Sequence, residues 1–589
     1  MGINVAVDPF GVFGDVLFDW DNYSQSLNPR IAKVCYVSER FDEFDSYIIG
    51  SSSAASYDPQ KLGEYTGTNA YNMFHYGSDT EFDRQLVEYL LENDSDVKNI
   101  LLVLGINEAD FIRTDDEKLT QHRHYKVTGA DPIRFYSEYL FADLGFAREK
   151  IESRIKDKPM PESYDVITAK NGCYDKRVRD VEPIGDADSY KALHGEDFYV
   201  EPVALPLKAI DECVNNVSRI SSLCKSRGVT LTVLLSPVNM NQLGAFSEAS
   251  LDEYFARLAE VTDYWNFAIS PLSYDDRYFY DATHTRNAAA DMVLATVFGN
   301  KEVYTPENYG ELWTKDSIKT VEQLKSIAEQ GGKAYAQNIP ILLYHHLADV
   351  SEGDSTLALS QFEHHLELIT KNGYTAVTFD DVINFVEKGT PLAKNPVIIT
   401  FDDGYTSNYK ALSLIEKYGC RATVFAIGSS VGADKYKDTD NSVIPHFNGE
   451  QAQEMIKSGV FYIGSHTYDM HQAEKYETGD RVRKNILPFE DESDAEYISA
   501  LSRDIEKQHD TFSDMGLDAP YVIAFPGGKF CTLADVVLKS YGYKVTLTTQ
   551  SDRKNTVIAG LSQSLYDMGR MNINADVTDE QILDYLSAR

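Results

Sequence analysis

Two adjacent carboxylates follow an apolar run in the sequence Thr-Phe-Asp-Asp-Gly-Tyr at residues 400–405. We expect residues 396–401 to form a buried strand, at whose end the side chains of Asp402 and Asp403 can turn into one cavity. Paired acids in such a place can divide their work, because one can bind a metal ion while the other stays free as a general base. Taken alone, Asp-Asp-Gly is more typical of a plain turn.

Two histidines downstream favour the metal interpretation. Residues 461–464 predict another strand, and Ser-His-Thr-Tyr-Asp-Met-His follows at residues 465–471. Positions five apart on a helix lie about 140° from each other, so His466 and His471 must share a loop to converge. One Asp and two His with open coordination positions form a ligand set that zinc hydrolases use.

A second set of polar residues follows the strands expected in the first half of the chain. Ser52 lies in a Gly-Ser-Ser-Ser run after residues 46–49, and Asn107 follows residues 100–104. Asp281 and His284 form a late Asp-x-x-His. In this order they are a nucleophile, an oxyanion donor and an oriented base, although a serine-rich turn by itself is also a common loop.

Alternating apolar runs and amphipathic segments must position both sets, which predicts an α/β protein. In the first half, a helix over residues 205–227, stopped by Gly228, precedes a strand over residues 229–235. The second half repeats strand and helix over about 250 residues, which favours a parallel barrel with its chemistry in the loops after the strands.

We therefore predict two domains joined by a connector. Residues 1–300 form the first domain, within which residues 110–200 are too long for an ordinary loop and form a lid or cap. Residues 301–338 are a linker, and residues 339–589 form the barrel.

The charge balance excludes some partners. Lys and Arg number 55 and Asp and Glu number 92, which gives a net charge of −37. Such a surface repels phosphate backbones and anionic lipids, so we expect no nucleic acid partner, whereas an uncharged polysaccharide is compatible. The six cysteines include no Cys-x-x-Cys pair, so we expect mostly buried thiols rather than a disulfide framework.

The second half resembles the polysaccharide deacetylases, the NodB-homology or carbohydrate esterase family 4 group. Ile-Pro-Ile-Leu-Leu-Tyr-His at residues 339–345 and Ala-Phe-Pro-Gly-Gly at residues 524–528 are similar to segments of that family. The resemblance implies a distorted (β/α) barrel and N-deacetylase activity. It also implies that Asp402 is the general base and that the metal ligands are Asp403, His466 and His471.

The sequence departs from that family at three points. The two histidines are five residues apart where most members have four, a spacing that resembles the poly-N-acetylglucosamine deacetylases of biofilm systems. The late Leu-x-His that supplies the general acid is absent, since residues 546–549 read Thr-Leu-Thr-Thr, and the Arg expected before Pro526 is missing. Either activity is slow without this acid, or another group protonates the leaving amine, for which His345 and His446 are candidates.

The first half resembles the SGNH hydrolases, among them exopolysaccharide O-acetyltransferases and D-alanyl-transfer proteins. The resemblance implies a three-layer α/β domain with Ser52 as nucleophile, His284 as base and Asp281 as its orienting partner. Asn107 and the Ser52 N–H would form the oxyanion hole. Phe74 stands where the family usually has Gly, and a degenerate domain that only binds its ligand is the alternative.

Together the resemblances predict a bifunctional enzyme of the cell envelope. The barrel removes N-acetyl groups from an N-acetylhexosamine polysaccharide with a divalent metal, Zn²⁺ first and Co²⁺, Ni²⁺ or Fe²⁺ as alternatives. The first domain removes or transfers O-acyl groups, with a membrane acyl-transfer protein as partner in the second case. The alternatives are a polysaccharide-binding scaffold with one or both sites inactive, and a protein in which only the first domain is catalytic.

Such enzymes act outside the cytoplasm, so we expect an extracytoplasmic protein. The start Met-Gly-Ile-Asn has neither the basic nor the apolar region of a signal peptide, and no run of about 18 apolar residues predicts a membrane span. We therefore expect that a signal or anchor precedes the sequence as given.

Overall fold

The computed structural model describes residues 1–20, 28–77, 79–110, 118–155, 166–167, 171–330, 335–479 and 481–587. The chain divides into two compact units. Unit 1 comprises Met1–Lys176 and Lys191–Tyr335, and unit 2 comprises Arg177–Tyr190 and Ala336–Arg589. Among the helices that the structure describes, none combines the length and the apolar character needed to cross a membrane.

A six-stranded sheet forms the centre of unit 1, in the order β2-β1-β3-β6-β7-β8. All neighbouring pairs are parallel except β7 and β8. The predicted strands after which Ser52 and Asn107 follow are confirmed as β1 and β3, and both are buried. The strands are β1 (Ser46–Gly50), β2 (Ala70–Asn72), β3 (Asn99–Leu104), β6 (Thr230–Leu235), β7 (Tyr264–Asn266) and β8 (Glu311–Trp313).

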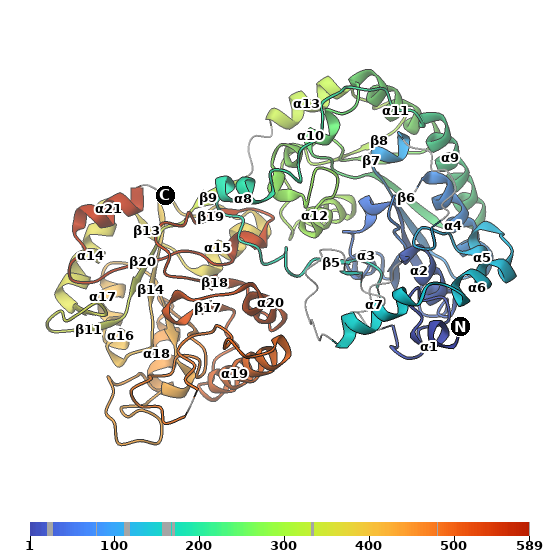
Figure 1. The fold of residues 1–589 in the computed structure, drawn as a ribbon. Coiled ribbons are helices and arrows are strands. Elements are labelled where there is room, and N and C mark those ends of the chain that lie inside the picture. The colour runs from blue at the N-terminus through green and yellow to red at the C-terminus, as the bar shows by residue number, and fades with distance from the viewer. Residues whose placement is uncertain are drawn as a thin grey trace. The chain divides into compact units, whose positions relative to one another are not determined.

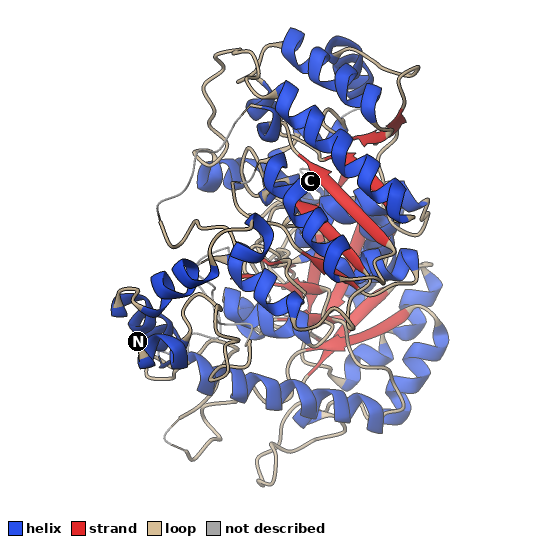
Figure 2. Ribbon diagram, turned by 90° about the vertical axis from the view of Figure 1, so that its right-hand side faces the viewer, coloured by secondary structure: helices blue, strands red, loops and turns tan. Residues whose placement is uncertain are grey.

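Helices cover this sheet, as Figure 1 shows for unit 1 and Figure 2 shows from a second direction. The predicted helix before β6 is α9, which begins at Ile210 and ends at Arg227. Gly228 follows it in the left-handed conformation that favours glycine, with φ 71°. The main helices are α3 (Pro59–Thr66), α4 (Thr80–Asn93), α9 (Ile210–Arg227), α11 (Glu248–Val261) and α12 (Asn287–Phe298). Further helices are α1 (Gly2–Val7), α2 (Pro29–Ser38), α6 (Pro132–Leu140), α7 (Leu144–Ile155) and α13 (Val321–Gln330).

Unit 2 is built on a curled parallel sheet in the order β18-β17-β16-β15-β14-β10-β20, with β13 paired to β14. Leu547, at the end of β18, bridges Met568 just before β20, so the two ends of the sheet approach each other. The predicted strands at residues 396–401 and 461–464 are confirmed as β14 and β16. The strands are β10 (Ile341–Tyr344), β13 (Thr375–Ala376), β14 (Pro396–Phe401), β15 (Ala422–Ala426), β16 (Phe461–Ser465), β17 (Val522–Ala524), β18 (Val545–Leu547) and β20 (Met571–Asn572).

The helices of unit 2 follow the strands along the chain and enclose the apolar core. Alternation of parallel strands and helices brings the carboxyl ends of β10, β14 and β16 to one edge of the sheet, where the predicted metal residues lie. The helices are α14 (Leu359–Lys371), α15 (Phe379–Lys388), α16 (Thr406–Lys410), α17 (Leu412–Lys417), α18 (Gly449–Ser458), α19 (Asp494–Asp514), α20 (Thr532–Ser540) and α21 (Asp579–Ser587).

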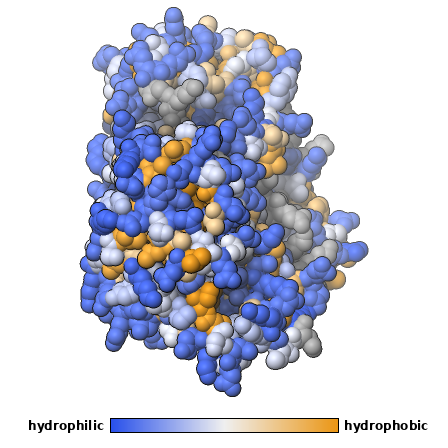
Figure 3. Space-filling model, turned by 90° about the vertical axis from the view of Figure 1, so that its left-hand side faces the viewer, coloured by the Kyte–Doolittle hydropathy of each residue, from blue (hydrophilic) through white to orange (hydrophobic). Residues whose placement is uncertain are grey.

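The surface and the cysteines agree with the composition. Figure 3 shows one face of the molecule on which hydrophilic residues predominate and apolar residues form scattered patches. Five cysteines are buried, Cys531 is half-buried, and all six are free thiols, as expected.

Candidate functional site

The carboxylates Asp402 and Asp403 leave the end of β14 in different directions. Asp402 directly follows the fully buried strand β14, and its N–H donates to the carbonyl of Tyr344 at 2.9 Å. Asp403 and Gly404 then take positive φ values of 70° and 77°. The chain therefore turns sharply, and the two neighbouring side chains acquire different partners.

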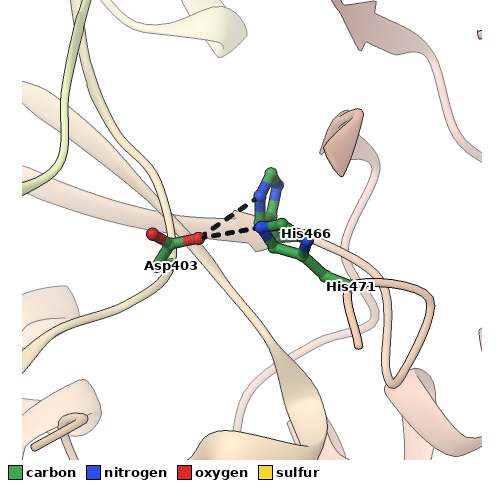
Figure 4. A group of neighbouring side chains, drawn as sticks. All are labelled: Asp403, His466 and His471. Carbon is green, nitrogen blue, oxygen red and sulfur yellow. Dashed lines mark ion pairs between the residues drawn. The ribbon is translucent and has the colours of Figure 1, made fainter. Parts of the chain in front are cut away.

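Asp403 faces the two predicted histidines (Figure 4). Its Oδ1 lies 3.5 Å from Nε2 of His466 and 3.6 Å from Nε2 of His471. One ligand atom from each of the three residues lies within 4.8 Å of the others. The loop after β16 thus brings together the residues that the sequence analysis assigned to a metal.

Both imidazoles are oriented by backbone carbonyls. Nδ1 of His466 bonds the carbonyl of Ala524 at 2.8 Å, and Nδ1 of His471 bonds the carbonyl of Lys484 at 3.3 Å. A proton on Nδ1 leaves the lone pair of Nε2 directed at Asp403, the tautomer that a metal-binding histidine needs. Burial also lowers the pKa of His466, which favours its neutral form. The donor set fits a divalent metal.

Asp504 in α19 holds the loop between the histidines. Its Oδ2 accepts the N–H of Tyr468 and its Oδ1 accepts the N–H of Asp469, both at 2.8 Å. On the other side of the loop, the N–H of Ser429 donates to the carbonyl of Tyr468 at 2.9 Å. Thr467 adopts a positive φ of 67°. The five-residue spacing is thus accommodated by a turn wound around a buried carboxylate, a residue that sequence reasoning missed because no motif marks it.

Asp402 is paired with Arg570, a second residue that sequence reasoning missed. The guanidinium donates to both carboxylate oxygens, at 2.7 Å and 2.8 Å, and its Nε donates to the carbonyl of Thr548 at 3.1 Å. Burial raises the pKa of Asp402, but Arg570 and His466 lower it more, to about 2. Asp402 is therefore ionised at neutral pH.

Two further histidines lie near these acids. His345 follows β10, and its positive form would lower the pKa of both Asp402 and Asp403. Its buried Nδ1 has no hydrogen-bond partner among the described residues. The ring of His446 lies 5.0 Å from that of Tyr405, and burial lowers its pKa while Asp403 raises it. Both candidates for the missing general acid thus interact electrostatically with Asp403.

In unit 1, the structure brings Ser52, His284 and Asp281 into hydrogen-bond contact. Nε2 of His284 lies 2.8 Å from Oγ of Ser52, and Nδ1 of His284 lies 2.8 Å from Oδ2 of Asp281. The N–H groups of Thr283 and His284 donate to Oδ1 of Asp281 at 2.8 Å and 2.9 Å. Burial raises the pKa of Asp281, and the bonds to His284 lower it more. The order of contacts, from hydroxyl to imidazole to carboxylate, is the order that serine hydrolases use.

Asn107 lies in a 3₁₀ turn after β3. Nε2 of Gln242 donates to Oδ1 of Asn107 at 3.0 Å, which leaves the Nδ2 hydrogens of Asn107 as donors to another group. Phe74 is fully buried, and its N–H donates to Oδ1 of Asn72 at 2.9 Å. Asn72 in turn donates to the carbonyls of Ala54 and Tyr57, beside the Ser52 turn. Phe74, which stands where the family usually has Gly, is therefore joined through Asn72 to the backbone beside the Ser52 turn.

Comparison with known proteins matches the second half of the chain. Residues 389–546 match the family model described as polysaccharide deacetylase. YxkH of Bacillus subtilis, named as a polysaccharide deacetylase, is 26% identical over 252 residues, which cover 42% of this chain and 76% of YxkH. The poly-beta-1,6-N-acetyl-D-glucosamine N-deacetylase of Escherichia coli K12 is 27% identical over 200 residues, or 32% of this chain and 30% of that protein.

Among solved structures, a de-N-acetylase from Aggregatibacter actinomycetemcomitans is 21% identical, with a TM-score of 0.37, and covers 42% of this chain and 100% of that chain. Because this TM-score is low, the likeness carries no argument here. The description of the curled parallel sheet rests on the strand pairings given above. The chain spans about three quarters of YxkH and under a third of the Escherichia coli relative.

Proposed function

Because the second half of this chain carries a polysaccharide deacetylase domain, we propose that it is an N-deacetylase acting on an N-acetylhexosamine polysaccharide. The observation that supports the proposal is the separation of the two carboxylates. Asp403 faces His466 and His471, whereas Asp402 faces Arg570. This separation favours metal binding by Asp403 and proton transfer by Asp402.

Asp403, His466 and His471 would hold the divalent metal. Two imidazole nitrogens and one carboxylate suit Zn²⁺ first, with Co²⁺, Ni²⁺ or Fe²⁺ as alternatives. Such an ion, when bound, supplies a Lewis acid that polarises the amide carbonyl and acidifies a water molecule.

Asp402 would act as the general base. It accepts the proton of the attacking water, whose oxygen forms a bond to the acetamide carbon. Arg570 keeps the carboxylate ionised and fixes its orientation through two charge-assisted hydrogen bonds. The backbone N–H of Tyr405 is the candidate second donor to the developing oxyanion.

The leaving amine needs a proton when the carbon–nitrogen bond breaks. Nδ1 is buried and unbonded among the described residues in both His345 and His446. We assign this step to His345, because its positive form would lower the pKa of both acids. His446 is the alternative. The products are then acetate and a free amine on the sugar.

The proposed substrate class rests on the relatives and on the charge of this chain. The Escherichia coli relative is named for poly-beta-1,6-N-acetyl-D-glucosamine, and the acidic surface of this chain is compatible with a neutral polymer and with the cationic product. We therefore propose an exopolysaccharide substrate. We also propose an extracytoplasmic site of action, and cell fractionation tests this location.

Acetate release from N-acetylglucosamine oligomers, with and without added divalent metal, tests the deacetylase. We expect metal-dependent release that Asp402→Asn abolishes and that Asp576→Asn, a change at an exposed aspartate of the same unit, leaves intact. Binding of the oligomer without acetate release in metal-loaded protein would favour the alternative of an inactive binding protein.

The contacts of Ser52 support a second activity in unit 1. Ser52 Oγ would attack an ester carbonyl while His284 takes its proton, and Asp281 would stabilise the resulting imidazolium. The alcohol leaves with the proton from His284, and the acyl group passes from Ser52 to water in an esterase or to a sugar hydroxyl in an O-acyltransferase. Delivery of the acyl group by a membrane acyl-transfer protein belongs to the transferase case.

A serine-directed fluorophosphonate probe tests this second activity. We expect labelling at Ser52 that Ser52→Ala abolishes and that His284→Ala slows strongly. Ser56→Ala, at a nearby serine, should keep the label at Ser52. It also removes the bond from Ser56 to the carbonyl of Thr285, next to His284, so its labelling rate is a weaker control than the label's position. A wild-type protein without label at Ser52 would contradict the assignment.

A further inference from the structure

A buried carboxyl lies beneath the Ser52 turn and has no part in the proposed chemistry. Glu108 follows Asn107 directly in the 3₁₀ turn after β3, and its side chain is only 2% exposed. Burial raises the pKa of Glu108 to about 7, with a further increase from Asp83, while the bond from Ser51 lowers it. Burying a carboxyl costs free energy unless the group is hydrogen-bonded.

Glu108 is bonded to both of the turns that carry the serine site. Its Oε1 accepts a hydrogen bond from the hydroxyl of Ser51, the residue before the nucleophile. Its Oε2 accepts the N–H of Gly105 at 3.0 Å, at the end of β3. The hydroxyl of Ser51 also accepts the N–H of Ser53 at 3.3 Å. One side chain therefore joins the turn after β1 to the turn after β3.

The two turns pack as closely as glycine permits. A Cβ atom added to Gly105 would lie 2.5 Å from Oγ of Ser53 and 2.7 Å from Oε2 of Glu108. A Cβ atom added to Gly50 would lie 2.2 Å from the carbonyl oxygen of Val103. Glycine at both positions therefore allows the two turns to approach closely, and the Glu108 carboxyl bridges them.

We propose that Glu108 is a positioning residue of the serine site, fixing the turn of Ser52 against the turn of Asn107 so that nucleophile and oxyanion donor act on one carbonyl. The inference rests on the serine activity proposed above. Glu108 itself does not reach the reacting atoms, because its two oxygens are engaged with Ser51 and Gly105.

The experiment is a double-mutant cycle on the full chain with p-nitrophenyl acetate as the ester. Glu108→Gln keeps the shape but introduces an amide that cannot accept both hydrogen bonds. We expect Asn107→Ala to lower kcat about 100-fold, as for loss of an oxyanion donor, and Glu108→Gln to lower it about tenfold or more, both with little change in KM. If Glu108 acts through Asn107, the double variant loses no more than Asn107→Ala alone.

Two controls separate positioning from loss of structure. Glu92→Gln alters an exposed glutamate of the same unit and should leave kcat unchanged. Ser51→Ala removes one of the two bonds to Glu108 and should give a smaller loss of kcat than Glu108→Gln, measured below the melting temperature of every variant. Multiplicative losses in the double variant, or a Glu108→Gln protein with wild-type kcat, would overturn the positioning role.

Fluorophosphonate labelling distinguishes this failure from failure of the serine site. Wild-type protein that reacts at Ser52 while Glu108→Gln reacts at the same rate overturns only the inference on Glu108. Wild-type protein without reaction at Ser52 overturns the serine activity and the inference together.

Discussion

The guanidinium of Arg570 lies 2.7 Å from one oxygen and 2.8 Å from the other oxygen of Asp402. Both side chains are buried, and 168 positions separate them in the sequence. Arg570 thus engages the carboxylate of Asp402, while the carboxylate of its neighbour Asp403 faces two histidines. The proposed division between base and metal ligand therefore depends on a residue near the end of the chain.

Replacing Arg570 by Met should damage both stability and turnover. The change leaves Asp402 buried without its partner, which costs about 3–5 kcal/mol for a buried ion pair broken on one side. Chemical denaturation measures the loss. Arg570→Lys keeps the charge but not the paired hydrogen bonds, and it should retain more stability than Arg570→Met. Equal stability of Arg570→Met and wild type would contradict the importance of the pair.

The pH dependence of turnover should also depend on Arg570. With Arg570 present, the pKa of Asp402 is about 2, so its protonation does not limit activity above pH 4. Without the guanidinium, the largest influence that lowers this pKa is lost, so the pKa of Asp402 rises and the base is protonated at a higher pH. We expect the acid limb of kcat/KM in Arg570→Lys to match wild type and that in Arg570→Met to move upward. An unchanged acid limb in both variants would argue against Asp402 as the base.

Loss of Asp504 should weaken metal binding without removing a ligand. Asp504→Asn can accept only one of the two N–H bonds from Tyr468 and Asp469, so the loop between the histidines loses its register. We expect metal affinity to fall about 10–100-fold, as for other residues that support metal ligands. Chelator competition and the visible spectrum of the Co²⁺-loaded protein measure the change. Asp510→Asn, an exposed position on the same helix, is the matched control.

The reaction of Ser52 with a fluorophosphonate should depend on both His284 and Asp281. Because His284 accepts the proton of Ser52, His284→Ala should slow labelling strongly. Asp281→Asn should slow labelling by several orders of magnitude, about 10⁴ in related triads, since it no longer stabilises the charged imidazole. Labelling that is insensitive to both changes would show that another residue reacts.

The sequence allowed the strands and their terminal residues to be predicted because apolar runs, glycines and polar motifs are local. β14 with Asp402 and Asp403, and β16 with His466, were found in this way, as were β1 with Ser52 and β3 with Asn107. The order of such motifs in a parallel fold then indicated which side chains share an edge of the sheet.

The residues that hold these side chains in place could not be predicted. Arg570, Asp504 and Glu108 act through contacts that depend on tertiary packing, and none belongs to a recognisable motif. The helix α9 was expected from residue 205 but begins at Ile210, since helix boundaries depend on neighbouring contacts as well as on local sequence. The spacing of apolar residues predicts helices and strands, whereas tertiary packing determines which buried charged side chains contact each other.

The central claim is that Asp402 and Asp403 have different duties. Metal content and acetate release, measured on the same preparations of wild type, Asp402→Asn and Asp403→Ala, test it most directly. We predict that Asp402→Asn keeps its metal and loses at least about 100-fold in turnover, because general-base catalysis is lost. Asp403→Ala should lose both metal and turnover. Full turnover in Asp402→Asn, or full metal content in Asp403→Ala, would contradict the account.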